Sequence, residues 1–340
     1  MYQNDDRKRT SQPDEWDNPA PYGFKSVLLV LIVFGLLTFS GKNIELNKLA
    51  TLSTEAGSYL LGMSEQSQII DGSKKIAASM FPPALSETIE VSRIEDFDPE
   101  RIPVFSKIKN IKTLTTSVDL STFEIKQSES VIQVLYNPIG YLVHVTKKML
   151  ETIEMAIWAT ILATLISVPL AYFSAANYTE NRLVYISARA IVSFLRAVPE
   201  LISAMFLVLM FGFGPIAGVL ALAFHAAGFL GKFYAEDIEN ADNGPQDALK
   251  AVGVPKLKRL RFAVLPNVLP QYVAYNMYIL DRNIRMATVV GIVGAGGIGQ
   301  ELKGRYDMFD YGHVTTILLL IFLTVYVLDQ ISSRIRSKLI

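Results

Sequence analysis

Charged side chains within or beside long apolar segments are the residues of this sequence that could do chemistry. Arg196 and Glu200 are four residues apart, and so are Asp281 and Arg285, whereas Arg282 is left without a counterpart. Side chains four apart share one face of a helix. Because a charge in hydrocarbon costs at least about 2.5 kcal/mol on insertion scales, each pair either neutralises itself near a membrane surface or serves in gating or anion passage.

The sequence leaves little room for catalytic or metal chemistry. It has no cysteine, which excludes a disulfide framework, a thiolate metal site and a cysteine nucleophile. Its three histidines, His144, His225 and His313, are far apart and have no acidic cluster beside them, so we expect no metal site. His225 lies within an apolar run, where a histidine is more often a hydrogen-bonded packing residue than a ligand. The chain is therefore not expected to be an enzyme.

A glycine block near the C-terminus has two interpretations. Residues 294–299 match the G-x-G-x-x-G dinucleotide fingerprint and follow a strand-like stretch, 288–293. That fingerprint needs a βαβ unit and an acidic residue about 20 positions further on, but Leu319 stands there in an apolar run. Close packing of helices is the better interpretation, since glycine lets two backbones approach. The expected packing glycines are Gly291, Gly294, Gly296, Gly297 and Gly299.

The composition and the apolar runs predict what must position these residues. Of the 340 residues 51% are hydrophobic and 19% charged, which argues against a soluble domain, and the zero net charge argues against a nucleic-acid partner. A hydrocarbon core needs about 20 apolar helical residues to cross it. We therefore predict an all-α integral membrane protein with six transmembrane helices. They cover residues 22–40, 155–179, about 186 to a break at 212–215, 215–233, 262–280 and 311–328.

The positive charges predict the orientation of these spans. Basic residues precede the first span, follow the last and fill the segment between the fourth and fifth, which are the same side if there are six spans. Both termini are thus expected in the cytoplasm of a cell whose plasma (inner) membrane holds the chain. The tails are 1–21 and 334–340, the outer loop is 41–148, and the core of five helices is 149–333. An acidic leader makes a cleaved signal peptide the weaker explanation of the first span.

The outer loop is expected to contain a small β-rich insert. Between Thr88 and Val134 the sequence alternates β-favouring stretches with acidic turns. About 47 residues barely suffice for an independent core, so the insert should lean on the membrane domain or on a partner. A spacer without a function of its own remains an equal alternative.

The segment 236–262, between the fourth and fifth spans, carries a spaced motif. Asp247-Ala248-Leu249 is followed after three residues by Gly253, and after a further eleven residues by Leu265-Pro266. Gly253 and Pro255 would end one short helix and set the turn into the next. The loop resembles the coupling loop of binding-protein-dependent ATP-binding cassette (ABC) importers, whose pattern is E-A-A, three residues, G, nine residues, I, one residue, L-P. Asp247, Leu249 and Ala263 replace its Glu, Ala and Ile. The resemblance gives the ATPase-coupling residues as Asp247, Ala248, Leu249, Ala251, Gly253, Leu265 and Pro266.

Further segments are similar to phosphonate importer permeases in particular. They are 81–83, 193–200 and 281–299, and the resemblance covers about two thirds of the chain. It implies a type I ABC importer permease core, a second permease chain of either the same or another kind, an extracytoplasmic binding protein and an ATPase dimer. ATP and its Mg²⁺ would be bound by that ATPase, because this chain has no G-x-x-x-x-G-K-[ST] motif and needs no cofactor of its own.

The resemblance also implies a substrate, namely a phosphonate, phosphite or other phosphorus oxyanion. The candidates for the translocation path are Arg196, Glu200, Asp281, Arg282, Asn283 and Arg285. Guanidinium groups offer planar donors to such an anion. A methionine-type or other small-solute ABC permease is the alternative. An ion-coupled secondary transporter is a weaker one, because internal repeats and a carboxylate deep inside a span would be needed.

Overall fold

The computed structural model describes residues 24–44, 46–64, 66–94, 97–99, 102–103, 105–118 and 125–339 of the chain. The chain divides into two compact units, Met1–Ala77 and Ala78–Ile340. The tail expected at 1–21 lies outside the described residues.

The first unit holds one membrane-length helix. This helix, α1 (Phe24–Asn43), is apolar enough to cross a bilayer and corresponds to the span expected at 22–40. Its large apolar side chains are exposed, as those of a lipid-facing helix would be. Two amphipathic helices follow, α2 (Leu46–Leu60) and the start of α3 (Gln68–Met80). Both lie within the expected outer loop, where no helix was predicted.

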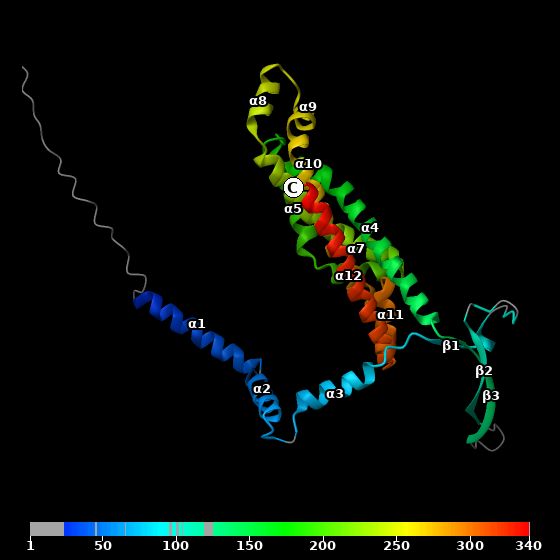
Figure 1. The fold of residues 1–340 in the computed structure, drawn as a ribbon. Coiled ribbons are helices and arrows are strands. Elements are labelled where there is room, and N and C mark those ends of the chain that lie inside the picture. The colour runs from blue at the N-terminus through cyan, green and yellow to red at the C-terminus, as the bar shows by residue number, and fades with distance from the viewer. Residues whose placement is uncertain are drawn as a thin grey trace, which may run out of the picture. The chain divides into compact units, whose positions relative to one another are not determined.

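The second unit is a bundle of helices with a small sheet (Figure 1). Its long helices are α4 (Gly140–Ser174), α7 (Pro215–Asn240), α10 (Leu265–Gly291) and α12 (Tyr311–Leu339). Between them come α5 (Arg182–Ala197), α6 (Glu200–Phe211), α8 (Asn243–Ala251), α9 (Lys256–Arg259), the π-helical turn η2 (Leu260–Val264) and α11 (Gly297–Asp307). The break predicted at 212–215 separates α6 from α7.

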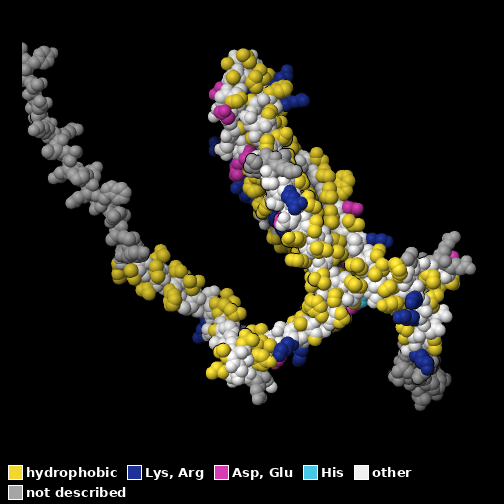
Figure 2. Space-filling view, in the orientation of Figure 1, with side chains coloured by type: hydrophobic (Ala, Val, Ile, Leu, Met, Phe, Trp, Pro, Cys, Tyr) yellow, Lys and Arg dark blue, Asp and Glu magenta, His cyan; other side chains and the backbone are white. Residues whose placement is uncertain are grey.

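Small residues form the centre of this bundle. Ala159 and Ala163 of α4 are fully buried, and so are Ala223 and Ala227 of α7. Apolar side chains gain nothing by leaving lipid for one another, so membrane helices associate through close contacts of this kind. Figure 2 shows hydrophobic side chains along the flanks of the long helices, with charged side chains gathered toward the α8–α9 end.

Four described helices are long and apolar enough to cross a membrane, and a fifth span results if the bent pair of α5 and α6 counts as one. The four are α1, α4, α7 and α12. The expected fifth span, 262–280, begins in η2 and continues into α10, which does not satisfy this criterion. A charged stretch that includes Asp281, Arg282 and Arg285 lies within this helix.

Two predicted helix boundaries were wrong. The third span was expected to run unbroken from about Ile186, but the chain bends by 91° between α5 and α6. Pro199 has no N–H to donate and disfavours the helical conformation of Val198, so both residues are extended. The second span was expected to reach Thr179, but α4 ends at Ser174 and a turn follows, after which Asn181 caps α5.

The β-rich insert is present as a three-stranded antiparallel sheet in the order β1-β3-β2. Its strands are β1 (Glu87–Glu90), β2 (Lys107–Val118) and β3 (Ile125–Asn137), and the 3-10 turn η1 (Val91–Arg93) follows β1. The segment before β1 is hydrogen-bonded to the start of α12, where Ala84 donates its N–H to the Gly312 carbonyl at 3.0 Å and Thr316 donates to the Ala84 carbonyl at 2.6 Å. These bonds attach the segment just before the insert to the membrane domain.

Figure 1 places this sheet and the α8–α9 loop at opposite ends of the helical bundle. Because the chain has no cysteine, single cysteines can report which side each end faces. Asn110 of β2 and Asn243 of α8 are both exposed. We predict that an impermeant maleimide labels Asn110→Cys but not Asn243→Cys in intact cells, and labels both after lysis. Labelling of Asn243→Cys without lysis would contradict the orientation.

Candidate translocation path and coupling loop

A charged cluster, in which Glu200 and His225 are buried and Arg282 is half-buried, joins three helices of the second unit. Glu200, the first residue of α6, is 8% exposed. Its Oε1 accepts a hydrogen bond from Arg282 Nη2 of α10 at 2.8 Å, and the same Nη2 lies 2.8 Å from Nε2 of His225 on α7. An arginine can only donate, so His225 Nε2 is the acceptor and its Nδ1–H donates to the Val198 carbonyl at 2.9 Å.

This cluster corrects two expectations about charge pairs. Arg196 and Glu200 do not share a helix face, because the bend at Pro199 separates α5 from α6. Arg282 is not left over, since it is the partner of Glu200. Arg196 instead lies beside the ring of Phe229, with 5.9 Å from Cζ to the ring centroid, and Arg282 lies at 4.8 Å from the same ring.

The second expected pair is present. Asp281 is 5% exposed and accepts a hydrogen bond from Arg285, four residues on in α10. Asn283 lies elsewhere on the helix, where its amide donates to the Thr160 hydroxyl of α4 at 3.0 Å. Six candidate residues thus fall into two charged groups and one amide contact, with Arg196 next to the first group.

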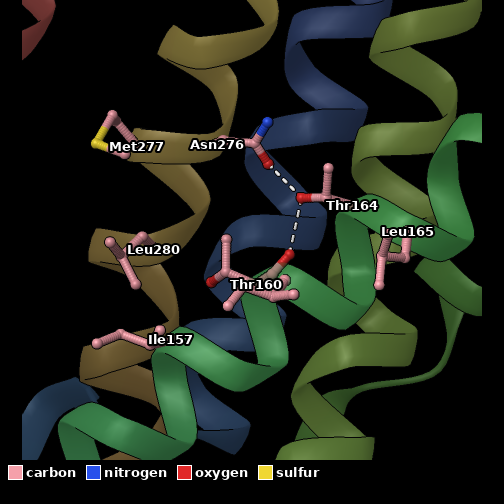
Figure 3. Close-up of a pocket in the computed structure, with 8 residues that line it drawn as sticks. Ile157, Thr160, Thr164, Leu165, Asn276, Met277 and Leu280 are labelled. Atoms are coloured by element: carbon pink, nitrogen blue, oxygen red, sulfur yellow. Dashed lines mark hydrogen bonds between the residues drawn. The ribbon is translucent and has the colours of Figure 1, made fainter.

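A polar row continues this contact along the boundary of α4 and α10. The Thr164 hydroxyl lies 2.8 Å from the Thr160 carbonyl and 2.6 Å from Oδ1 of Asn276, as Figure 3 shows. Asn276 in turn donates to the Tyr234 hydroxyl of α7 at 2.6 Å. The row borders a cavity of about 330 Å³ that is otherwise lined by apolar side chains such as Leu280.

The glycine block forms the turn from α10 into α11. The stretch 288–293 is helical through Gly291 rather than strand-like, so no βαβ unit stands here. A Cβ at Gly299 would lie 1.9 Å from the Thr288 carbonyl oxygen, and one at Gly291 would lie 2.5 Å from the Gly296 carbonyl oxygen. Gly294, Gly296 and Gly297 have positive φ. The turn is therefore a place where two backbones touch.

The expected coupling motif folds as two short helices joined at a glycine. Gly253, with φ of 78°, follows α8, and the N–H groups of Gly253 and Val254 donate to the carbonyls of Lys250 and Leu249, both at 3.0 Å. This is the left-handed glycine ending of a helix. Of the expected coupling residues, Leu265 and Pro266 begin α10, whereas Asp247, Ala248 and Ala251 are exposed on α8 beside a half-buried Leu249.

The loop presents apolar surface away from the bundle. Val252 is 76% exposed and Leu257 is 66% exposed. We call α8 and α9 with the turn between them the knob. Exposed apolar side chains grouped in this way are typical of an interaction surface.

Contacts that sequence reasoning missed tie the knob to the turn between α4 and α5. The Tyr178 hydroxyl donates to the buried Gln246 side chain of α8 at 2.8 Å. Lys256 of α9 pairs with Glu180 at 2.5 Å, and its hydrogen bond and charge lower the pKa of that carboxyl. Nearby, Arg189 of α5 pairs with Glu239 of α7 at 2.7 Å. A displacement of the knob would therefore also displace α4, α5 and α7, as well as α10.

No metal site was found in the described ranges, since nowhere in them do three His, Cys, Asp or Glu side chains lie together as a metal ion would require. The three histidines make other contacts. His313 of α12 lies 2.7 Å from the Asp310 carboxylate, and His144 of α4 lies 3.5 Å from Glu301 of α11.

Comparisons with known proteins agree with this architecture. The family described as binding-protein-dependent transport system inner membrane component matches residues 167–339. The chain is 55% identical over 261 residues to a putative phosphite transport system permease protein of Stutzerimonas stutzeri, covering 77% of this chain and 100% of that one. It is 40% identical over 190 residues to a phosphate-import permease protein of Mycolicibacterium smegmatis, covering 56% and 36%. An inward-facing MetNI methionine ABC transporter is similar in fold, with a TM-score of 0.52 at 22% identity, over 58% of this chain and 96% of that chain.

The glycine turn provides a stringent test of the packing. We predict that Gly299→Ala destabilises the protein by about 1–3 kcal/mol, the usual cost of overpacking, because its new methyl group meets the Thr288 carbonyl. Gly304→Ala, in the same helix with nothing within 4 Å of its Cβ, is the matched control. The thermal midpoints of the purified proteins measure the difference. Equal midpoints would contradict the close packing.

Proposed function

The chain belongs to the family of binding-protein-dependent transport system inner membrane components, and from this we propose that it forms the path by which a phosphorus oxyanion crosses the membrane. It is a membrane permease and the non-catalytic part of such a system. ATP hydrolysis falls to a separate ATPase dimer, a binding protein delivers the anion from outside, and a second permease chain completes the path. Both termini lie in the cytoplasm.

The broken helix at Val198–Pro199 is the observation that supports this path best. Irregular backbone at membrane depth is tolerated only where it is buried in protein or lines a polar cavity. Here the bend brings Glu200 to Arg282 and frees the Val198 carbonyl for His225. Arg282 is a guanidinium donor inside an apolar bundle, and Glu200 neutralises it so that an anion would be bound weakly. Weak contact suits a permease, whose binding protein provides the affinity.

The names of the relatives support the substrate class. One is named for phosphite and the other for phosphate. Both are tetrahedral phosphorus oxyanions, which guanidinium groups bind through paired donors. The remaining path candidates, Arg196, Asp281, Asn283 and Arg285, are proposed to line the same route at other depths.

The knob formed by α8 and α9 is proposed to couple this path to the ATPase. Its exposed Ala248, Ala251 and Val252 would seat in a cleft of that subunit. Closure of the ATPase dimer then pushes the knob, and the contacts of Tyr178 and Lys256 pass the movement to the helices around the path.

Uptake measurements test the substrate class. In a strain that lacks this permease but keeps its ATPase and binding protein, we predict lost uptake of phosphite, a phosphonate or phosphate, restored by the intact chain. Methionine uptake is measured alongside. Undiminished phosphorus uptake together with lost methionine uptake would favour a methionine-type permease instead.

The turn at Gly253 tests the coupling. We predict that Gly253→Leu abolishes uptake and the ATP hydrolysis stimulated by the binding protein, while its abundance in the membrane stays near normal. The reason is that a large side chain is strained at a φ of 78° and would reshape the knob, although no atom lies within 4 Å of its Cβ.

Gly244→Ala is the control for that variant. It stands in the same loop, and its Cβ would make only ordinary contact with Asp242 at 3.6 Å. Normal transport by Gly253→Leu would overturn the coupling assignment, and equal defects in both variants would show that the whole loop is merely sensitive.

A further inference from the structure

Another cavity, this one with a polar lining, lies between the end of α4 and the facing sides of α5 and α7. It measures about 290 Å³, and its polar lining consists of Ser174, Arg189, Ser193, Arg196, Lys232 and Glu236. Three cations thus converge with a single carboxylate, whereas the cavity between α4 and α10 is lined mostly by apolar side chains.

The three cations are engaged to different degrees. Arg189 pairs with Glu239 at 2.7 Å and donates to the Ser174 carbonyl at 3.0 Å. Lys232 and Glu236 are 3.4 Å apart, a loose pair. Within the described residues Arg196 forms no ion pair, and its guanidinium lies only beside the Phe229 ring. The three cations therefore outnumber the two carboxylates that pair with them, Glu236 of the lining and Glu239.

One buried polar group in the lining also has no partner. The Ser174 side chain is buried, and its hydroxyl makes no hydrogen bond within the described structure. Leaving a buried hydroxyl unpaired costs about 1–3 kcal/mol. The lining thus contains an unpaired polar group beside its cations.

The backbone around the cavity is closely fitted. A Cβ at Gly228 of α7 would lie 2.7 Å from the Arg196 backbone nitrogen, and one at Gly231 would lie 3.2 Å from the Val192 side chain. The close approach of α5 and α7 holds Arg196 against α7, so the cations are held by packed helices rather than by a loop.

We propose that this cavity binds a tetrahedral phosphorus oxyanion through Arg196 and Lys232. It is distinct from the Glu200–Arg282 cluster, but Phe229 contacts both Arg196 and Arg282 and so connects the two. Binding here does not depend on the proposed function. Only one part rests on the proposed function, namely that the transported anion binds this cavity last, before its release on the knob side of the membrane.

The same chemistry has two sources, a free oxyanion and the headgroup of an anionic phospholipid. Purified permease–ATPase complex without nucleotide, in nanodiscs of neutral lipid, separates them. Equilibrium binding of radiolabelled phosphate is compared among the parent, Arg196→Gln, Lys232→Gln and the control Arg182→Gln. Arg182 is exposed at the start of α5, outside the cavity. The ATPase contributes the same background in every sample.

If the ligand is a free oxyanion, we predict that the parent and Arg182→Gln each bind one phosphate per permease chain above the ATPase background. In the two cavity variants the affinity for that phosphate should be lower by about tenfold or more. If the ligand is a lipid headgroup, the complex should lose this phosphate binding in nanodiscs that contain anionic phospholipid, because the lipid occupies the cavity. Mass spectrometry should then find that lipid retained by the parent and by Arg182→Gln alone.

Equal phosphate binding and equal lipid retention in all four proteins would overturn the proposal. If one cavity variant fails to fold, as judged by its thermal midpoint, the other still decides. Because the readout is binding, a negative result here leaves the uptake test of the proposed function untouched.

Discussion

A carboxylate buried among apolar helices must have a partner, and the second unit is arranged around that requirement. Glu200 is placed by the bend at Pro199, and its partner Arg282 comes from α10 while His225 comes from α7. Removing one member of a buried ion pair is costly because the other charge stays behind, at about 3–5 kcal/mol in soluble proteins. The broken helix before Glu200, His225 inside α7 and the charge of Arg282 in α10 are therefore parts of one charged cluster.

Small residues determine how that feature connects to the rest of the permease. Alanines join α4 to α7, Gly228 holds α5 against α7, and the glycine turn folds α11 back on α10. When helices are packed this closely, a displacement of one helix displaces its neighbours. The knob is attached to the same helices through Tyr178 and through α10, so a displacement of the knob by the proposed ATPase partner would reach the Glu200–Arg282 cluster through closely packed contacts.

Local signals in the sequence predicted the local structure well. Gly253 at its turn, the break at 212–215 and the small sheet could be predicted because glycine, proline and β-branched residues act on their own backbone. Val198-Pro199 is a helix-breaking signal of the same kind, but the long apolar run around it led us to predict one unbroken span. The Glu200–Arg282 pair could not be predicted, since its members are 82 residues apart and meet only through packing. The partners of Tyr178 and of His225 were missed for the same reason, although the hydrogen-bonded packing role expected of His225 is confirmed.

A double-mutant cycle on the buried pair tests the central claim most directly. Thermal midpoints are measured for the purified permease–ATPase complex with Glu200→Gln, Arg282→Gln and both together, beside the exposed pair Lys303 and Asp307 of α11 as a control. The account predicts that the double variant is destabilised by less than the sum of the single variants, by an interaction free energy of about 1–3 kcal/mol, and that the control pair is nearly additive. Additive effects at Glu200 and Arg282 would contradict it.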